Sequence, residues 1–487
     1  MVFSSVEFLF MLFPGTLALY FLLSRLPDKI KKVRDPLLNM LLISASLLFY
    51  AWGEPVLLVL LLTSVLANWL FGLGIARGKG RKLLLTAAVA LNIGLLGVFK
   101  YAGFATELLN GITGLSLPVP QIALPIGISF YTFQALSYVI DVYRDPQLVQ
   151  KNGFRLLLYI SFFPQLIAGP IVRYGDIADQ LKSRRLTVDG AMIGFRRLFI
   201  GLGKKILIAD ELAVLVNVCF THQAAGQLPT GFAWLGAIAY LLQIYFDFSG
   251  YSDMAIGMGH IFGFRFPENF NYPYASLGIK DFWRRWHITL STWFREYLYI
   301  PLGGNRKGKK RMLLNQLIVF FCTGLWHGAN MTFVVWGLYN GLFLILESND
   351  ILPVRRVKSF PGKILVRIYT LITVTVGFVI FRADNLTQAA AYLGKMFAFG
   401  SDWFAWGDRS LWTEILPCLT PYFFTILGLA VIGAAPITPA IRRLCDSHPR
   451  LDGAAQRLSL VWSLILLALC AMSLAAGTYS AFIYFQF

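Results

Sequence analysis

The sequence has few charged residues and few cysteines. Only 14% of its 487 residues are Asp, Glu, Lys or Arg, whereas 57% are hydrophobic; soluble domains carry about a quarter charged residues. The five cysteines show no CxxC spacing, and an odd number in apolar surroundings argues against a disulfide framework or a zinc site. These scarcities exclude an ordinary soluble enzyme and a disulfide-rich domain, and we expect no bound metal.

Acidic residues are also scarce relative to basic ones. The chain has 25 Asp and Glu against 43 Lys and Arg, which gives a formal net charge of +18. The basic residues lie in short loops between apolar runs, not on one soluble domain, so the charge does not indicate nucleic-acid binding. Such loops set membrane orientation and contact anionic headgroups. We therefore expect membrane lipids as partners, and no nucleic acid.

Apolar runs long enough to cross a bilayer recur along both ends of the chain. The first run, residues 6–26, lacks a basic leader and a small-residue cleavage site, so it is predicted to be a retained span. The positive-inside rule places the basic loop at 28–34 in the cytoplasm. The N-terminus is then extracytoplasmic, and the same alternation places the C-terminal tail outside as well.

The middle of the chain differs from its ends because its apolar segments are broken by Pro, Gly and charge. Backbone that leaves a helix at membrane depth must be shielded by protein or line a wet cavity. The sequence thus predicts an all-α polytopic membrane protein with a single membrane-embedded domain, 1–487. Residues 1–120 form N-terminal spans, 121–347 the catalytic core, and 348–487 the C-terminal spans and an aromatic tail.

His327 lies in an apolar stretch, 312–346, that is too long for one span and is interrupted at Gly324 and Gly328. It follows Arg311 by 16 residues, so a helix places it at most about 24 Å from the cytoplasmic edge. An ionisable group at that depth marks a pathway or site, and a neutral imidazole can take a proton from an attacking hydroxyl. The alternative is a helix-packing histidine bonded to Asn330 or a carbonyl.

The run at 281–297 combines three Arg, three Trp and one His. Arginine pairs bidentately with phosphate, and an aromatic face can stack on a planar base. The functional interpretation is an anion-binding wall facing the cytoplasm, made by Trp283, Arg284, Arg285 and Arg295, with His287 in the same segment. The alternative is an aromatic belt with snorkelling arginines.

Two further features have both a structural and a functional interpretation. Asp247 and Asp253 lie in one apolar segment but six residues apart, so not on one helical face. They either pair with nearby arginines or orient a histidine.

The chain ends in an aromatic tail, 482–487, whose Tyr484 is either an interfacial anchor or a nucleophile that folds back into the core.

Five motifs together resemble the membrane-bound O-acyltransferases. They are LPIGISFY at 124–131, LIAGP at 166–170, the run at 245–253, the run at 281–302, and WHGAN at 326–330. Within that family the sequence is similar to the bacterial alginate O-acetylation branch and to peptidoglycan O-acetyltransferases. The resemblance extends along the whole chain and is densest in the predicted core.

The resemblance implies a helical core around a transmembrane funnel or tunnel, with roughly 10–12 membrane helices plus short interfacial or re-entrant helices, in the bacterial plasma (inner) membrane. It places His327 at the family's active-site histidine and His287 at its second polar position. It makes Tyr484 a catalytic acyl relay. From the residues themselves we predict that the binding wall and Asn330 bind substrate and that Asp247 and Asp253 are structural or orienting.

The resemblance also implies an activity. An O-acetyltransferase of this branch needs no bound cofactor; it takes an acetyl group from cytoplasmic acetyl-CoA and passes it toward an exported polysaccharide, peptidoglycan or alginate-like. An extracytoplasmic SGNH-type acetyltransferase is the expected partner. One alternative is a lipid or protein O-acyltransferase of the same superfamily, which needs a lateral opening and a long acyl donor. Another is a transporter, suggested by broken helices and buried charge.

Overall fold

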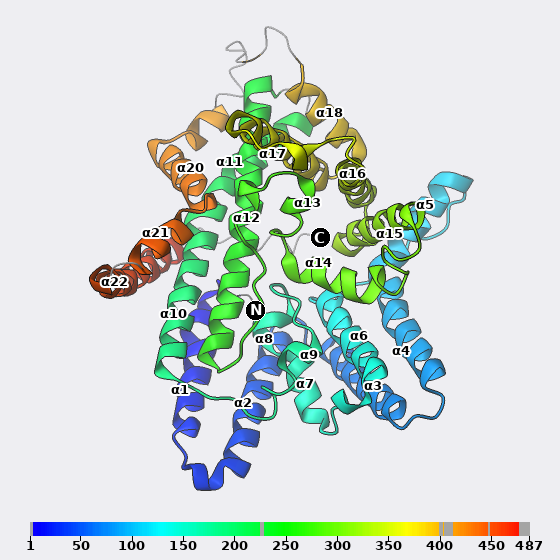
Figure 1. The fold of residues 1–487 in the computed structure, drawn as a ribbon, viewed down its shortest axis with the longest axis vertical. Coiled ribbons are helices and arrows are strands. Elements are labelled where there is room, and N and C mark those ends of the chain that lie inside the picture. The colour runs from blue at the N-terminus through cyan, green and yellow to red at the C-terminus, as the bar shows by residue number, and fades with distance from the viewer. Residues whose placement is uncertain (1–2, 225–227, 399–402, 404–412, 447–448, 477–487) are drawn as a thin grey trace. The chain divides into compact units, whose positions relative to one another are not determined.

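The computed structural model describes residues 3–224, 228–398, 403, 413–446 and 449–476. Every regular element in these ranges is a helix (Figure 1). The chain divides into two compact units: unit 1 comprises 1–198 and 251–268, and unit 2 comprises 199–250 and 269–487. The all-α class expected from the sequence is confirmed.

Six helices in the described part of the chain are long and apolar enough to cross a membrane. Their bounds are Lys31–Ala51, Leu58–Ala76, Arg81–Thr113, Thr230–Ile261, Met331–Ser348 and Phe360–Arg382. Three shorter apolar helices accompany them, at Phe8–Ser24, Pro421–Ala434 and Val461–Ala475. The helices cover the apolar runs of the sequence, as a polytopic membrane protein requires.

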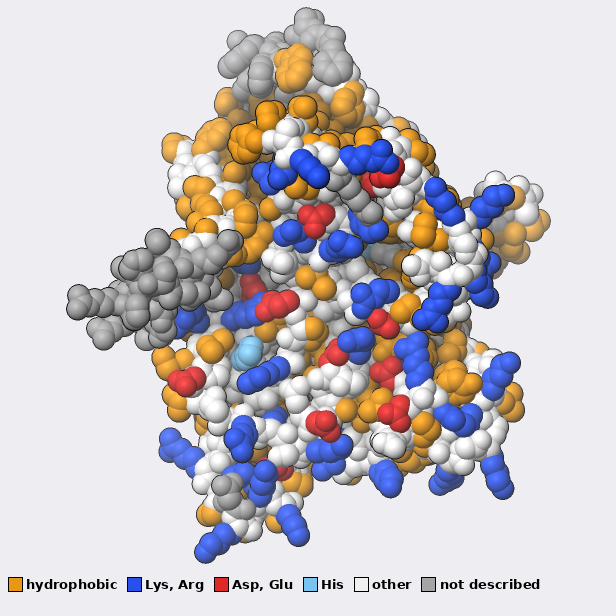
Figure 2. Space-filling model, in the orientation of Figure 1, with side chains coloured by type: hydrophobic (Ala, Val, Ile, Leu, Met, Phe, Trp, Pro, Cys, Tyr) orange, Lys and Arg blue, Asp and Glu red, His pale blue; other side chains and the backbone are white. Residues whose placement is uncertain are grey.

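Unit 1 contains all of the predicted N-terminal spans, 1–120. Its helices are η1 (Phe8–Leu12), α1 (Phe13–Ser24), η2 (Asp28–Ile30), α2 (Lys31–Ala51), α3 (Leu58–Ala76), α4 (Arg81–Leu96), η3 (Gly97–Tyr101), α5 (Ala102–Thr113), α6 (Ile128–Arg144), η4 (Pro146–Leu148), α7 (Gly153–Ser161), α8 (Phe163–Leu166), α9 (Tyr174–Ile177), most of α10 (Val188–Gly203) and the end of α12 (Thr230–Ile261). Lys and Arg side chains surround the turns that join α1 to α2 and α3 to α4 (Figure 2). These turns are the basic loops that the sequence places in the cytoplasm.

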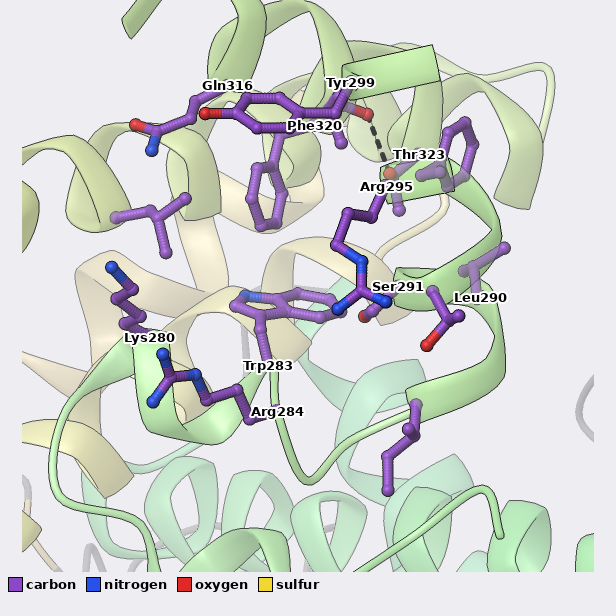
Figure 3. Close-up of a pocket in the computed structure, with 15 residues that line it drawn as sticks. Lys280, Trp283, Arg284, Leu290, Ser291, Arg295, Tyr299, Gln316, Phe320 and Thr323 are labelled. Atoms are coloured by element: carbon purple, nitrogen blue, oxygen red, sulfur yellow. Dashed lines mark hydrogen bonds between the residues drawn. The ribbon is translucent and has the colours of Figure 1, made fainter. Parts of the chain in front are cut away.

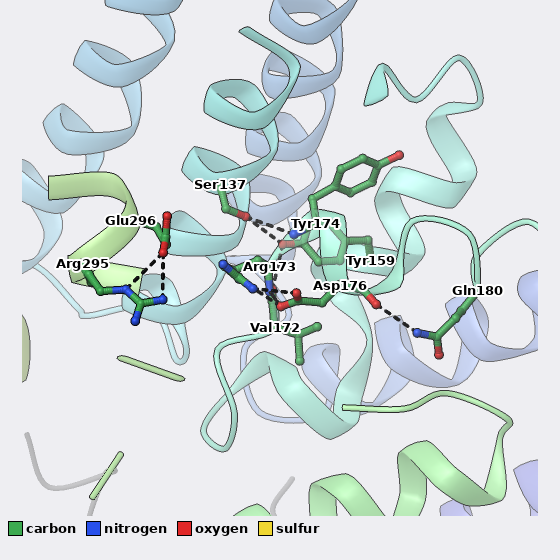
Figure 4. Close-up of polar contacts among 9 residues, drawn as sticks. All are labelled: Ser137, Tyr159, Val172, Arg173, Tyr174, Asp176, Gln180, Arg295 and Glu296. Carbon is green, nitrogen blue, oxygen red and sulfur yellow. Dashed lines mark hydrogen bonds and ion pairs between the residues drawn. The ribbon is translucent and has the colours of Figure 1, made fainter. Parts of the chain in front are cut away.

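Polar side chains join the helices of unit 1 inside its apolar surroundings. Asn68 of α3 and Asn92 of α4 exchange amide hydrogen bonds of 3.2 and 2.7 Å. The hydroxyls of Ser137 and Tyr159 lie 3.0 Å apart, and Ser137 also accepts the Tyr174 N–H (Figure 4). Paired amides and hydroxyls satisfy groups that apolar packing would leave without partners.

Unit 2 contains the C-terminal spans and residues 199–250 and 269–347 of the predicted core, whereas residues 121–198 and 251–268 of that core lie in unit 1. The helices of unit 2 are the end of α10, η5 (Lys204–Ala209), α11 (Asp210–Ala224), most of α12, η6 (Pro273–Ala275), α13 (Ile279–Phe282), α14 (Ile288–Phe294), η7 (Arg295–Tyr299), α15 (Lys309–His327), α16 (Met331–Ser348), η8 (Val354–Arg356), α17 (Phe360–Arg382), α18 (Leu386–Met396), η10 (Leu416–Cys418), α20 (Pro421–Ala434), α21 (Ile437–Asp446) and α22 (Pro449–Ala475). Among these, η5 and η7 are π-helical turns, a geometry frequent at functional sites.

Helices α15 and α16 form the closest pair in unit 2, and two glycines allow their contact. A Cβ atom at Gly324 would collide with the carbonyl oxygen of Phe333, and one at Gly337 with that of Phe320. The backbones therefore touch directly, as small residues permit at membrane helix interfaces. This contact fixes the end of α15, where His327 lies.

Candidate active site

His327 is the last residue of α15, at the break in the long apolar stretch. The chain then runs extended through Gly328, and α16 begins at Met331. Asn330 is the N-cap of α16: its Oδ1 accepts the Thr332 N–H at 3.0 Å, while its Nδ2 donates to the carbonyl oxygen of Asp384 at 2.8 Å. The interruption predicted between 312 and 346 is confirmed, and Asn330 holds the turn that follows the histidine.

His287 and His327 lie in one aromatic enclosure within unit 2. Their ring centroids are 6.5 Å apart, and their side chains are nearly inaccessible, at 1% and 6% exposure. Trp336 and Phe381 stand edge-on to His327 at 5.0 and 5.1 Å, and Phe248 stands edge-on to His287 at 4.5 Å. The fold thus joins two histidines that are 40 positions apart in the sequence.

The backbone of His287 is strained. Its φ of 43° and ψ of 54° lie in the left-handed region, which costs a residue other than glycine about 1–3 kcal/mol. Asn269 holds the strained turn, because its carbonyl oxygen accepts the Ile288 N–H at 2.9 Å. Such strain persists where the surroundings impose it, and it concentrates at active sites.

The hydrogen bonds around Asn269 fix the tautomer of His287. Asn269 Oδ1 accepts the Thr289 backbone N–H at 3.3 Å and the Thr289 hydroxyl at 2.8 Å, so this atom is the amide oxygen. His287 Nδ1, 3.1 Å from the same oxygen, must then donate a proton to it. In the neutral ring, Nε2 carries the lone pair, and it has no hydrogen-bond partner among the described residues. His287 therefore presents a buried acceptor or base at Nε2.

We expect His287→Asn to fold and to lose activity. Asparagine adopts the left-handed conformation more readily than most residues, so the turn is retained while the ring nitrogen is removed. Loss of an acid–base or hydrogen-bonding group predicts a fall in kcat/KM of about 10²-fold, with a melting temperature close to that of the wild type. Acyl transfer by purified, folded protein measures the effect. His287→Gly is the companion variant; full activity in either would show that only the backbone turn matters.

A cavity of about 450 Å³ opens beside the histidine pair. Its lining includes Ile288, the residue after His287, and Thr323, one helical turn before His327, but neither histidine itself. Figure 3 shows Lys280, Trp283 and Arg284 on one wall, Arg295 extending toward them, and Tyr299, Gln316 and Phe320 opposite. The remaining lining residues are Leu290, Ser291, Thr292, Phe294, Val319 and Leu344. The cavity is apolar with a cationic side, as a ligand with a charged end and an apolar arm requires.

The arginines of the predicted binding wall have different surroundings. Arg284 lines the cavity, is exposed, and has no carboxylate within ion-pair distance among the described residues. Arg295 also lines it but donates to Glu296 through Nε at 3.1 Å and Nη2 at 2.8 Å (Figure 4). Arg285 lies outside the lining and donates to Asp281 at 3.1 Å. Arg284 is therefore the arginine best placed to meet a phosphate.

Trp283 is a packed part of the cavity wall and does not present an open ring face. It is 8% exposed, stands edge-on to Phe320 and Trp336 at 5.2 and 5.7 Å, and its Nε1 donates to Asn340 Oδ1 at 3.3 Å. It is an anchored wall of the cavity.

The remaining predicted residues lie elsewhere. Asp247 pairs with Lys205 Nζ at 2.7 Å, and Asp210 pairs with the same nitrogen at 2.7 Å, in a cluster that is almost fully buried in unit 2. In unit 1, Asp253 accepts from Arg197 Nε at 2.9 Å. Both carboxylates thus have cationic partners. Tyr484 lies outside the described residues.

Several residues of the site carried no signal in the sequence. Lys280 stands next to the aromatic run, and Tyr299 and Gln316 join it only in space. Asn269 lies 18 residues before His287, in a loop, yet it sets both the strain and the tautomer of that histidine. The left-handed Tyr272 and His287 cannot be read from the sequence, since glycine is the usual residue there.

Comparisons with known proteins agree with this geometry. Residues 134–349 match the model of the membrane-bound O-acyltransferase family. Over 503 aligned positions that cover both chains completely, the sequence is 41% identical to the "Probable alginate O-acetylase AlgI" of Pseudomonas putida. The chain belongs to the membrane-bound O-acyltransferase family. This acyltransferase is also 39% identical to the protein of the same name in Pseudomonas aeruginosa, again over both whole chains.

A peptidoglycan O-acetyltransferase is a further relative. The acyltransferase is 37% identical over 427 positions to that enzyme of Helicobacter pylori, covering 81% of this chain and 80% of the relative. Family membership and the six apolar helices identify it as a multi-pass membrane enzyme. The predicted family, fold class and enzyme class are confirmed, and the matched segment contains His287, His327 and the whole cavity lining.

Proposed function

We propose that this acyltransferase takes an acetyl group from cytoplasmic acetyl-CoA and transfers it toward an exported polysaccharide, alginate-like or peptidoglycan, through an extracytoplasmic acetyltransferase partner of the SGNH type. The observation that carries the proposal is the cavity with a cationic wall beside two buried histidines. The names of the relatives, an alginate O-acetylase and a peptidoglycan O-acetyltransferase, support the class of acceptor. The membrane is the bacterial inner membrane, with both termini outside.

The cavity suits the two ends of acetyl-CoA. The phosphates of acetyl-CoA lie against Lys280, Arg284 and Arg295, which offer charge-assisted hydrogen bonds. The pantetheine arm lies against the apolar lining and brings the thioester toward the histidines. The exposed basic segment at 305–311, which spans the end of the η7–α15 connection and the first residues of α15, adds positive potential around the entrance (Figure 2). By the positive-inside rule this entrance faces the cytoplasm.

The chemistry assigned to the histidines conserves atoms and charge. His327 takes the proton of the incoming hydroxyl while the hydroxyl oxygen attacks the thioester carbonyl carbon. The tetrahedral intermediate expels the CoA sulfur, the C–S bond breaks, and the proton held by His327 passes to that sulfur. His287 Nε2 accepts a hydrogen bond from an N–H or O–H that the substrates bring into the enclosure. The products are an acetyl ester and free CoA.

The first acceptor of the acetyl group is the Tyr484 hydroxyl in this proposal. A phenol has a pKa near 10, so base assistance makes it a competent nucleophile, and its ester is activated for the next transfer. The ester then passes to the partner's serine or to the glycan. The supporting observation is the aromatic sequence of the tail, 482–487.

Mass spectrometry after incubation with isotopically labelled acetyl-CoA tests the proposal. We expect label on Tyr484 in the wild-type protein and none in His327→Ala. Tyr484→Phe controls for the site of labelling. Labelled polysaccharide with an unlabelled tail would retain the acetyltransferase and reject the relay. If wild-type protein neither releases CoA nor transfers label, acetyl-CoA is not the donor.

A further inference from the structure

Glu347, near the end of α16, is a buried carboxylate that the proposed chemistry does not use. It is 1% exposed, and no Lys or Arg of the described chain pairs with it. A buried carboxylate without a cation is costly unless its oxygens are fully hydrogen-bonded. The partners that it has therefore show what holds it in place.

These partners are backbone N–H groups of the segment that forms the cationic wall. Glu347 Oε1 accepts the Ile279 N–H at 2.6 Å, and Oε2 accepts the Lys280 N–H at 3.0 Å. The Tyr369 hydroxyl donates to Oε1 at 3.3 Å. Both carboxylate oxygens thus hold the first turn of α13, whose Lys280 lines the cavity and which leads directly to Trp283 and Arg284.

The residues around this contact complete it. The Gly278 N–H donates to Thr370 Oγ1 at 2.9 Å, and the Leu277 N–H donates to Asp281 Oδ2 at 3.1 Å. Gly278 has a φ of 102°, and a Cβ there would lie 3.0 Å from both oxygens of Glu347. Glycine is needed here both for its backbone conformation and for the approach of the carboxylate. The start of the wall is therefore attached to α16 and α17 at three consecutive N–H groups, those of residues 278–280, while the Leu277 N–H bonds within the wall to Asp281.

We propose that Glu347 is a positioning residue for donor binding. This proposal rests on the proposed function. Glu347 acts through the backbone at 279–280 to hold Lys280 and Arg284 against the cavity. The histidines have separate supports. Asn269 holds His287 through the Ile288 N–H and through Nδ1, and the glycine contact of α15 with α16 fixes His327. Loss of Glu347 therefore weakens donor binding and leaves the chemical step in place.

Glu347→Gln tests this assignment, because an amide replaces one acceptor oxygen with a donor facing a backbone N–H. We expect KM for acetyl-CoA to rise about tenfold, the cost of one charge-assisted hydrogen bond, while kcat at saturating donor stays within about twofold. Hydrogen exchange at the amides of Ile279 and Lys280 should accelerate. Asn349→Ala is the matched control, since that side chain bonds only to the Ile345 carbonyl of its own helix.

The outcomes separate this proposal from the proposed function. CoA binding by His327→Ala protein, with and without Glu347→Gln, is measured by calorimetry. If protein with Glu347 intact does not bind CoA, the proposal that acetyl-CoA is the donor is wrong. If it binds CoA and Glu347→Gln binds equally well, or if kcat alone falls, the positioning role is wrong. Should Glu347→Gln fail to fold, Thr370→Val, which removes the acceptor for the Gly278 N–H, provides the same measurement, and an unchanged KM there overturns the proposal.

Discussion

Replacing His327 with alanine is expected to lower kcat for acetyl transfer by about 10²- to 10⁴-fold, the usual contribution of a general acid–base group. In the proposed mechanism the ring removes the hydroxyl proton and returns it to the CoA sulfur, and His287 is the only other described side chain of the enclosure with a basic ring nitrogen. KM for acetyl-CoA should change little, because the cationic wall is intact. Thiol release from acetyl-CoA by purified protein gives both constants.

His222→Ala is the matched control for that experiment. His222 is also buried in unit 2, but its Nε2 lies 3.1 Å from Glu414 and the residue is absent from the cavity lining. Its replacement should leave acetyl transfer near the wild-type rate. Equal rates for His327→Ala and the wild type would reject His327 as the base.

Arg284→Glu is expected to raise KM for acetyl-CoA by about 10²-fold. Removing one charge-assisted hydrogen bond to phosphate costs about tenfold, and a carboxylate in its place adds repulsion. The effect should depend on the donor: S-acetyl-pantetheine, which lacks the phosphates, should show the same KM with the variant and the wild type. Steady-state kinetics with both donors measures the difference.

Two other arginines sharpen the comparison. Arg285→Glu should have a smaller effect, since Arg285 pairs with Asp281 outside the cavity lining. Arg356→Glu serves as a remote control, because that side chain is 72% exposed and pairs with Asp350. An equal rise in KM for both donors with Arg284→Glu would mean that the arginine does not meet phosphate.

Much of the architecture could be predicted from the sequence, because membrane burial demands long apolar runs and helical hydrogen bonding. The break between α15 and α16 is an example: Gly328 and Asn330 interrupt an apolar stretch too long for one span, whereas Gly324 continues α15 and serves its contact with α16. His327 is predicted as a site residue for the same reason, since an ionisable group in such a stretch has few structural uses.

The composition of the cavity could not be predicted in the same way. Three neighbouring cationic residues, Arg284, Arg285 and Arg295, look alike in sequence, yet only the fold gives Arg285 its own carboxylate and leaves Arg284 at the cavity. The contribution of Asn269 depends on a loop closing onto His287, and that of Glu347 on α16 reaching the start of α13. A local sequence pattern does not show which segments, distant in the sequence, will be in contact in the fold.

The π-helical turn η7 makes the lining of the cavity depend on the number of residues between α14 and α15. Such a turn holds one residue more than the α-helical turn it replaces, and each residue rotates a helix by about 100°. Deleting a single residue from Arg295–Tyr299 would therefore turn Tyr299 away from the cavity while Arg295 keeps its place. For an evolving lineage, a one-codon insertion or deletion here would reshape the cavity without any substitution.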